Sequence, residues 1–454
     1  MTTPREDQPL HIFFFPLMAP GHIIPMSSLA ALFAARGVRS TLLTTPSNYP
    51  YIPHHPQIHL LPFPNQNNLT DAADSMRFFD SLEHLRDHFH HLLLLHRPDC
   101  VVTDSFLPWT ADVACLAGVP RIAFQTMGFF PLCVIDSTRA LNTGPHPALT
   151  SEQTISIEGL PNTISMKRSQ IDPSAFHPNE FSKFYDRVVA ADDNSFGSIV
   201  NTFYELEPEY ADHYSAVTKR KAWHVGPVNI GLGHSISDPS TRVLSWLDER
   251  ATGSVVYVCF GTLSRLTREQ EREIRLGLAD SGVPYIWVTS GSEEEPNSDE
   301  KGLIVRGWAA QGAILGHRAV GGFVTHCGWN SVLEALARAV PMVTWPLCAD
   351  QFYNERLVVE VLGVGIAIGA EVWTMTAEER TVIGRGKVAE AVGRVMGGGD
   401  MAVGMRRRVR EVAEMARRAV EKGGSSYGDL ERVIGELWGA CREKEVQSLV
   451  ENFD

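Results

Sequence analysis

A strand-like run, a glycine turn and a helix-like run follow one another in the second half of this chain. Apolar residues predict a buried strand over Ala319–Thr325, and their spacing predicts a helix over Trp329–Ala337. Between them lies His326-Cys327-Gly328, and the first turn of the helix contains Asn330-Ser331. The N-terminus of a helix exposes unpaired N–H groups and about half a positive charge. The turn therefore predicts a phosphate-binding site, with an ordinary strand-to-helix connection as the alternative.

The residues on either side of this turn favour a sugar nucleotide as the ligand. Trp308 offers a flat apolar ring and Gln311 an amide, which suit a nucleobase. Glu334 lies further along the same predicted helix and can hold ribose hydroxyls. Asp350 and Gln351 supply an acceptor and a donor for the hydroxyls of a sugar. Receptors for base, diphosphate, ribose and sugar thus lie within one stretch.

A diphosphate that leaves in a transfer reaction carries negative charge, which many enzymes neutralise with Mg²⁺ held by acidic residues. No acidic cluster accompanies this turn. The helix N-terminus would instead meet the charge, with His326, Asn330 and Ser331 donating hydrogen bonds. Gly261-Thr262, a second predicted strand-to-turn junction, can supply donors from the opposite wall. We therefore expect no metal and no cofactor.

His22 is the candidate general base, because histidine is the commonest base near neutral pH. It follows the first predicted strand, just past Pro20-Gly21, and Asp104 follows another buried strand. A carboxylate on the far ring nitrogen would orient the imidazole and stabilise its protonated form. The alternative is an ordinary packed or surface histidine, since the chain contains 17 histidines.

A second group of histidines, His84, His88 and His91, falls near one face of a predicted helix. A metal site is conceivable there, but no cysteine or catalytic carboxylate stands at ligand spacing. Solvated or acceptor-lining histidines are the preferred interpretation.

Composition limits the classes of protein to which this chain can belong. With 454 residues and 44% hydrophobic content, it is expected to form at least two globular domains. A net charge of −13 argues against a nucleic-acid partner, and we interpret the basic run Arg406–Arg410 as a solvated helix face. Seven scattered cysteines, no signal-like N-terminus and no long apolar run predict a reduced, cytoplasmic protein without a membrane span.

Strands and helices alternate along the chain, which predicts right-handed βαβ units around parallel sheets. A Gly-, Ser- and Pro-rich stretch divides the alternation into two halves. The fold class is therefore α/β, with two Rossmann-like doubly wound domains facing each other across a cleft. We expect an N-terminal domain over residues 1–228, a linker over 229–240 and a C-terminal domain over 241–435. The expected strands are His11–Phe15, Val38–Thr44, Ile58–Leu61, Asp99–Thr103, Arg121–Phe124, Ser198–Asn201, Ala222–Val225, Val255–Phe260, Pro284–Val288, Ala319–Thr325, Val340–Trp345 and Val364–Ile368. The expected helices are His22–Arg36, Ser75–Leu95, Ala111–Leu116, Phe181–Ala191, Arg242–Asp248, Arg268–Asp280, Trp329–Ala337, Asn354–Leu362, Thr376–Met396, Met401–Glu421 and Tyr427–Arg442.

The segment Trp308–Gln351 closely resembles the donor-binding box of plant family 1 UDP-dependent glycosyltransferases. The likeness spans nearly the whole chain, including His11–Met26, Val101–Trp109, Asn201–Pro208, Ala222–Pro227 and Val255–Thr262. It implies the GT-B fold, with an acceptor-binding N-terminal domain and a donor-binding C-terminal domain. It also implies that a C-terminal tail, residues 436–454, packs back on the N-terminal domain.

The resemblance assigns roles to individual residues. It implies that His22 and Asp104 form the catalytic dyad, and that a glutamine at Gln351 goes with glucose as the donor sugar. For the nucleoside, the resemblance implies that Trp308 and Gln311 bind uracil and the nearby ribose, and that Glu334 binds the ribose diol. The diphosphate would be bound by His326, Asn330 and Ser331, beside Gly328 and Thr262. The sugar would be bound by Trp329, Asp350 and Gln351. Two positions depart from the family: Ala310 replaces a usual proline and Ala339 a usual glycine, so both bear on loop geometry.

The acceptor site is less well marked by the sequence. Apolar and aromatic residues lie at or after the carboxyl ends of the predicted strands, although each alone could be a core residue. Together they suggest an apolar acceptor such as a flavonoid, another phenolic or a terpenoid. These residues are Met18, Phe124, Met127, Phe129, Phe130 and Leu141.

The expected activity is transfer of glucose from UDP-glucose to a hydroxyl of a small molecule, with inversion at the anomeric carbon. The expected partners are these two substrates alone, and the chain is expected to be a monomer. One alternative is transfer of another sugar (rhamnose, xylose or galactose) or extension of an existing glycoside. A non-catalytic sugar-nucleotide binder is a further alternative, although the whole set of site residues argues against it. An NAD-dependent oxidoreductase is disfavoured, because no GxGxxG motif follows the first strand.

Overall fold

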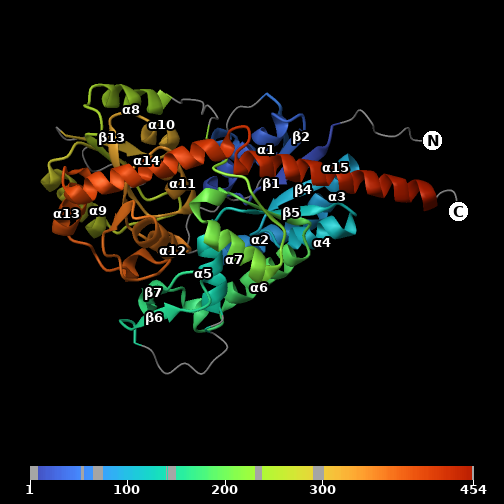
Figure 1. Cartoon of the computed structure of the whole chain (residues 1–454), viewed down its shortest axis with the longest axis horizontal. Coiled ribbons are helices and arrows are strands. Elements are labelled where there is room, and N and C mark those ends of the chain that lie inside the picture. Colours follow the sequence, from blue (N-terminus) through green and yellow to red (C-terminus); the bar gives the residue numbers. More distant parts are fainter. Residues whose placement is uncertain are drawn as a thin grey trace.

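The chain folds into two α/β domains in a computed structural model that describes residues 9–52, 56–64, 75–139, 141, 150–230, 238–289 and 301–451 (Figure 1). Each domain is built on one parallel sheet, which confirms the predicted fold class. The predicted linker, residues 229–240, lies between the two sheets in sequence, and its residues 231–237 are outside the described part of the chain.

The N-terminal sheet has seven strands in the order β3-β2-β1-β4-β5-β8-β9, and every neighbouring pair is parallel. Its central strand β1 is buried at all five positions, as a strand covered by helices on both faces must be. The order of the strands reverses between β1 and β4, and ligands of such sheets bind at the carboxyl ends beside this point. The strands are β1 His11–Phe15, β2 Arg39–Thr44, β3 Ile58–Pro62, β4 Cys100–Asp104, β5 Arg121–Gln125, β8 Gly197–Val200 and β9 Ala222–His224.

The C-terminal sheet has six parallel strands in the order β12-β11-β10-β13-β14-β15. Here the order reverses between β10 and β13, so the turns after these two strands also meet at a ligand-binding edge. The strands are β10 Val255–Cys259, β11 Tyr285–Thr289, β12 Gly302–Arg306, β13 Val320–Thr325, β14 Met342–Thr344 and β15 Gly365–Ala367, and a separate antiparallel hairpin consists of β6 Thr154–Ile157 and β7 Ile164–Lys167.

Helices cover both sheets. The helices of the N-terminal half are α1 Pro20–Ala34, α2 Ser75–Leu82, α3 Arg86–His96, α4 Trp109–Leu116, α5 Phe129–Arg139, α6 Glu180–Asp193 and α7 Pro208–Thr218. Those of the second half are α8 Asp238–Asp248, α9 Arg268–Ser281, α10 Gln311–Leu315, α11 Trp329–Ala337, α12 Gln351–Arg356, α13 Arg385–Met396, α14 Asp400–Val420 and α15 Ser425–Glu451.

All twelve predicted strands are present within a few residues of their expected bounds, but several other predictions were wrong. The single helix predicted over Ser75–Leu95 is broken by a 3-10 turn at Glu83–Leu85, and the helix predicted from Thr376 begins only at Arg385. The hairpin β6–β7 and the elements β12, α5, α7 and α10 were missed. These elements are short, between four and eleven residues, and a few residues give a weak periodic signal even where one face is buried, as in α7.

The last helix returns to the N-terminal domain earlier than the predicted tail boundary at residue 436. Figure 1 shows α14 and α15 running along the molecule, with α15 over the N-terminal half. Near the start of α15, Asp429 accepts hydrogen bonds from the backbone N–H of His224 at 2.8 Å and from its ring at 2.9 Å. Leu430, Val433 and Leu437 are buried in the core of the N-terminal sheet.

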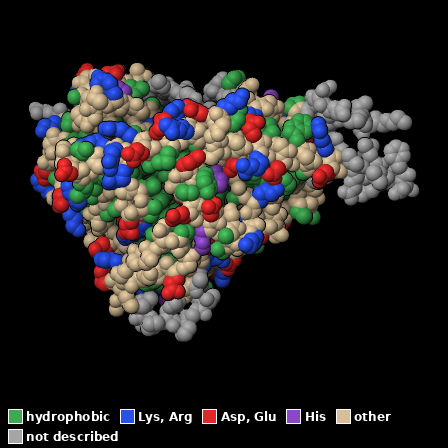
Figure 2. Space-filling view, in the orientation of Figure 1, with side chains coloured by type: hydrophobic (Ala, Val, Ile, Leu, Met, Phe, Trp, Pro, Cys, Tyr) green, Lys and Arg blue, Asp and Glu red, His purple; other side chains and the backbone are tan. Residues whose placement is uncertain are grey.

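Charged side chains of both signs are interspersed over the face shown in Figure 2. Within the basic run of α14, Arg406 donates to the carbonyl oxygens of Val395 and Gly397, and Arg408 donates to that of Gly363. The interpretation of this run as a solvated face holds for Arg407 and Arg410, which are exposed, but not for the two arginines that bind backbone carbonyls. None of the helices in the described part of the chain is long and apolar enough to cross a membrane.

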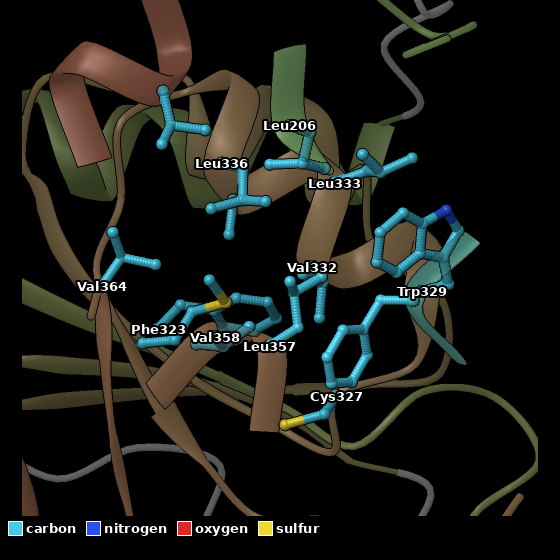
Figure 3. Packing of buried hydrophobic residues seen from close by; sticks show 14 of the residues in the cluster. Leu206, Phe323, Cys327, Trp329, Val332, Leu333, Leu336, Leu357, Val358 and Val364 are labelled. Carbon is cyan, nitrogen blue, oxygen red and sulfur yellow. The ribbon is translucent and has the colours of Figure 1, made fainter. Parts of the chain in front are cut away.

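The two domains share one apolar core behind the cleft. Figure 3 shows Leu206, from the N-terminal half, beside Leu333 and Leu336 of α11. The same cluster includes Phe129 and Phe130 of α5 on one side and Trp329 and Val332 on the other. Apolar burial of this kind stabilises the contact by about 25 cal/mol for each Å² removed from water, so it holds the domains facing each other.

Candidate active site

A cavity of about 640 Å³ lies between the domains, where the carboxyl ends of the two sheets face each other. Its walls include the first turn of α1 from one domain and the N-terminal end of α11 from the other. All of the predicted donor-binding residues line it, as does His22: they are Thr262, Trp308, Gln311, His326, Gly328, Trp329, Asn330, Ser331, Glu334, Asp350 and Gln351. The structure thus brings together residues that are more than two hundred positions apart.

His22 and Asp104 form a hydrogen-bonded pair at one wall of this cavity. Proline at the first position of α1 starts the helix, and His22 follows in its first turn. Strand β4 pairs with β1, so Asp104 at its end lies beside that turn. His22 Nδ1 is 2.7 Å from Asp104 Oδ2, and the other carboxylate oxygen accepts the N–H of Phe106 at 3.0 Å. Asp104 is fully buried, whereas the His22 side chain keeps 20% exposure.

The carboxylate raises the basicity of the imidazole. Burial alone would lower the pKa of His22, but the charge and hydrogen bond of Asp104, with Asp350 further away, outweigh burial and raise the pKa above its usual 6.5. With Nδ1 occupied by Asp104, the remaining nitrogen Nε2 is the one able to take a proton from a substrate.

His326 has the opposite environment. Its ring lies between two glycines, since a Cβ atom on Gly261 would be 2.7 Å from Nε2 and one on Gly328 would be 2.5 Å from it. Gly261 also has a φ of 79°, which L side chains rarely adopt. Burial lowers the pKa of His326 to about 4, so the ring is neutral near pH 7. Its Nδ1 atom is buried and has no hydrogen-bond partner among the described residues.

The N-terminal end of α11 presents Trp329, Asn330 and Ser331 to the cavity, and the first two also form hydrogen bonds to the N-terminal domain. The indole of Trp329 is 3% exposed, and its N–H donates to the carbonyl oxygen of Asn201 in the N-terminal domain at 2.8 Å. Trp329 also lines the cavity, and its backbone N–H at the start of α11 is not used by this contact, so the expectation that Trp329 contacts the sugar stays a prediction. Asn330 likewise donates to the carbonyl oxygen of Gly21 at 2.5 Å.

A chain of hydrogen bonds holds the side chains predicted for the base and ribose. Gln311 Nε2 donates to Ser331 Oγ at 3.1 Å and to Glu334 Oε2 at 3.0 Å, and Trp308 is 37% exposed beside them. Asn229, from the connection between the domains, donates to Glu334 Oε1 at 2.7 Å. No sequence signal pointed to Asn229, because a linker residue has no period and no motif of its own.

Asp350 and Gln351, the two polar residues predicted to bind the sugar, both use part of their hydrogen-bonding capacity within the protein. Gln351 Oε1 accepts the N–H groups of Leu347 at 2.9 Å and Cys348 at 3.1 Å, so this oxygen closes the preceding turn. Asp350 Oδ2 accepts from Asn354 at 2.8 Å, and burial raises the pKa of Asp350 to about 6. Gln351 Nε2 donates one of its two N–H groups to Cys348 Sγ at 3.8 Å, so its second N–H and the other oxygen of Asp350 are the groups left for a sugar.

Most of the predicted acceptor residues do not reach the cavity. Met127 lines it, but Met18, Phe124 and Phe129 are fully buried in the hydrophobic cores, and neither Phe130 nor Leu141 is on the cavity wall. Those predictions were wrong because a core aromatic and a pocket aromatic look alike in sequence. The side chains that do form the apolar wall include Ile24, Phe106, Ile135, Phe181, Tyr185 and Tyr353.

Ala339, where the family usually has glycine, has a backbone conformation that favours glycine. Ala339 follows α11 with a φ of 58°, in the left-handed region where glycine is favoured. Ala310 has a φ of −72° just before α10, which proline would also accept.

The described residues include no group of three or more His, Cys, Asp or Glu side chains placed to hold a metal ion, and this applies to His84, His88 and His91 as well. The ring of His88 instead packs edge-on against Phe63, with centroids 5.0 Å apart.

Comparison with known proteins identifies the family to which the chain belongs. The sequence model described as UDP-glucoronosyl and UDP-glucosyl transferase matches residues 231–383. UDP-glucose flavonoid 3-O-glucosyltransferase 7 of Fragaria ananassa is 42% identical, over 95% of this chain and 97% of that protein. Scopoletin glucosyltransferase of Nicotiana tabacum is 38% identical, over 94% of this chain and 98% of that protein.

Two solved structures share the whole architecture. Glycyrrhiza uralensis UGT73P12, complexed with glycyrrhetinic acid 3-O-monoglucuronide, superposes with a TM-score of 0.88 at 32% identity, covering 98% of this chain and 99% of that one. Medicago truncatula UGT71G1, complexed with UDP-glucose, gives a TM-score of 0.80 at 26% identity, covering 94% and 98%. Together with the sequence relatives, these show that the chain belongs to the UDP-glycosyltransferase family of plants and is a GT-B glycosyltransferase.

Proposed function

We propose that this enzyme transfers glucose from UDP-glucose to a hydroxyl of a small phenolic acceptor, with inversion at the anomeric carbon. The observation that carries the proposal is that His22 lies on the cavity wall with the buried carboxylate of Asp104 behind it, 2.7 Å away, while the other wall holds the donor residues. The names of the relatives support the substrates, since one is a flavonoid and another a scopoletin glucosyltransferase.

In the proposed step, the acceptor oxygen attacks the anomeric carbon from the side opposite the diphosphate. His22 Nε2 takes the proton of the acceptor hydroxyl, and the bond from the anomeric carbon to the diphosphate oxygen breaks with its electron pair leaving on UDP. An α-linked donor therefore gives a β-glucoside. Moving a proton from a phenol, pKa about 10, to an ordinary histidine, pKa about 6.5, costs about 5 kcal/mol. The carboxylate of Asp104 reduces this cost, because it raises the pKa of His22.

The leaving diphosphate would be met by protein groups alone. The N-terminus of α11, the hydroxyl of Ser331 and the neutral ring of His326 all lie on the donor wall of the cavity. A helix N-terminus and neutral donors stabilise a phosphate without contributing a full positive charge. We therefore propose that turnover needs no divalent metal and that EDTA leaves the rate unchanged. We also expect a monomer on size-exclusion chromatography, since one chain supplies every residue of the site.

The experiment is turnover of a phenolic and terpenoid panel with UDP-glucose, UDP-rhamnose, UDP-xylose and UDP-galactose, with products read by mass. We expect a gain of one hexose from UDP-glucose and loss of turnover in His22→Ala. A faster reaction with another donor would replace the glucose assignment, and acceptors that are already glycosides test extension of a sugar chain. The proposal is wrong if no donor is consumed with any acceptor, or if His22→Ala keeps the rate of the parent enzyme.

A further inference from the structure

The segment connecting the two domains passes directly over Asn201, the residue that follows strand β8. The backbone N–H of Val228 donates to Asn201 Oδ1 at 3.2 Å. Gly226 lies so close that a Cβ atom there would be 2.8 Å from the same oxygen. At the other side, Ser426 of α15 donates to the carbonyl oxygen of Gly226 at 2.6 Å. The connecting segment Gly226–Asn229 is therefore held against Asn201.

Asn201 also reaches across to the donor domain. Its side-chain nitrogen Nδ2 donates to Asn330 Oδ1 at 3.2 Å, and its backbone oxygen accepts the indole N–H of Trp329. Asn330 in turn donates from Nδ2 to the carbonyl oxygen of Gly21, the residue before His22. Asn201 is only 2% exposed, so an unmade hydrogen bond of its amide would cost about 1–3 kcal/mol.

The direction of this hydrogen-bond chain is set at both ends by backbone groups. The N–H of Val228 can only donate, so it must face the oxygen of the Asn201 amide. The nitrogen of Asn201 then faces Asn330, whose oxygen must accept. This turns the Asn330 nitrogen toward Gly21, whose carbonyl oxygen can only accept. Each asparagine therefore has one orientation, and an aspartate at position 201 breaks the sequence of bonds.

We propose that Asn201 is a positioning residue for the glucosyl transfer. It fixes the amide of Asn330 so that the donor-binding helix α11 is tied to the turn carrying His22. Asn330 lines the cavity, and the second N–H of its amide, which the bond to Gly21 does not use, is the one available to the diphosphate. This inference rests on the proposed function. It adds that the distance between the catalytic base His22 and the bound UDP-sugar is set by a residue that touches neither substrate.

The test replaces the amide nitrogen of Asn201, which donates a hydrogen bond, by an oxygen of nearly the same size. In Asn201→Asp the carboxylate still accepts from Val228, but it repels the oxygen of Asn330. The Asn330 amide must then turn over, and its oxygen faces the carbonyl of Gly21, so that contact is lost. Displacing the catalytic base His22 from the acceptor hydroxyl slows the proton transfer. We therefore expect kcat to fall by about ten-fold or more, with the KM for the acceptor changed less than about two-fold. Asn201→Ala, which adds no charge, is the second variant should the aspartate hinder folding.

A double-mutant comparison separates positioning from general stability. Asn330→Ala removes the bond to Gly21 itself, so adding Asn201→Asp to it should produce no further loss of kcat. The matched control is Asn194→Asp, an exposed change that also removes an amide nitrogen bonded to a carbonyl, that of Ala190 at 2.8 Å. It should leave kcat unchanged.

Two results would overturn the inference while the parent enzyme turns over normally. One is a kcat within about three-fold of the parent in folded Asn201→Asp and Asn201→Ala. The other is a loss in the double variant that equals the product of the two single losses, which indicates independent effects. Failure of the parent enzyme to transfer glucose would instead refute the proposed function.

Discussion

Gly128 lies against the indole of Trp329 so closely that a methyl group on Gly128 would be 2.5 Å from Trp329 Cζ2. The two residues belong to opposite domains, one just before α5 and the other at the start of α11. A Cβ atom at Gly128 would also be 2.7 Å from Glu207 Oε1, which accepts the N–H of Phe129, while Oε2 accepts that of Phe130. The domain contact thus depends on the absence of one side chain.

We expect Gly128→Ala to push α11 away from the N-terminal domain and lower kcat by about ten-fold or more, since small displacements of reacting groups cost rate steeply. Steady-state kinetics with UDP-glucose, alongside a melting curve, measures the effect. The matched control is Gly386→Ala in α13, where nothing lies within 4 Å of the added Cβ. Parent-like kinetics in Gly128→Ala would contradict the contact.

Asp104→Asn should change both the rate and its pH dependence. Without the Asp104 carboxylate, only the charge of Asp350 still opposes the effect of burial, so the pKa of the His22 imidazole should fall below its raised value. The base is then unprotonated down to lower pH, and the acid limb of the kcat profile should move to lower pH. The maximal rate should fall by about a hundred-fold or more, because the imidazolium formed in the step loses its partner.

The measurement is kcat against pH from about 5 to 9 for the parent and the Asn variant. An acid limb at the same pH in both proteins would show that another group controls it.

Asn229→Ala should weaken donor binding selectively. The change removes the 2.7 Å hydrogen bond to Glu334, whose carboxylate then loses one of its two amide partners. We expect the KM for UDP-glucose to rise by about ten-fold, corresponding to about 1.4 kcal/mol, with the KM for the acceptor unchanged. A matched rise in both KM values would indicate a general disturbance of the cleft instead.

Glu355→Gln should stabilise the protein above neutral pH. Glu355 is 2% exposed, accepts a hydrogen bond from Thr344 Oγ1 at 2.7 Å, and has its pKa raised to about 7 by burial. Because the folded-state pKa exceeds the unfolded value of 4.5, the protonated form favours folding, and this contribution is lost as pH rises from 4.5 through 7. The shift corresponds to about 3 kcal/mol in the free energy of unfolding.

Urea unfolding at about pH 5.5 and pH 8.5 measures this difference. The parent should lose more stability than Glu355→Gln on going to the higher pH. Glu411→Gln, at an exposed position 60% accessible at its side chain, should behave like the parent. Equal pH dependence in the parent and Glu355→Gln would contradict the role of the buried carboxyl.

The sequence by itself determined the α/β class, the twelve predicted strands and the residues that face the donor side. Continuous apolar runs such as that of β1 identify buried parallel strands, and side chains placed directly after them must gather at the carboxyl edge of a sheet. His22, Asp104, His326 and Glu334 become candidates through residue type and position along the chain, and the resemblance to the glycosyltransferase family then assigns their roles. Local information suffices there because a strand end and a helix start are set by neighbouring residues.

Tertiary structure alone decided which residues face the acceptor and which face the other domain. Phe124 and Phe106 are both aromatic and both follow or end a strand, yet one is buried in the core and the other lines the cavity. The sequence also does not show that the indole N–H of Trp329, a residue of the cavity wall, donates to the carbonyl oxygen of Asn201 in the other domain. Such assignments depend on contacts between segments more than a hundred residues apart, and neither periodicity nor spacing carries that information.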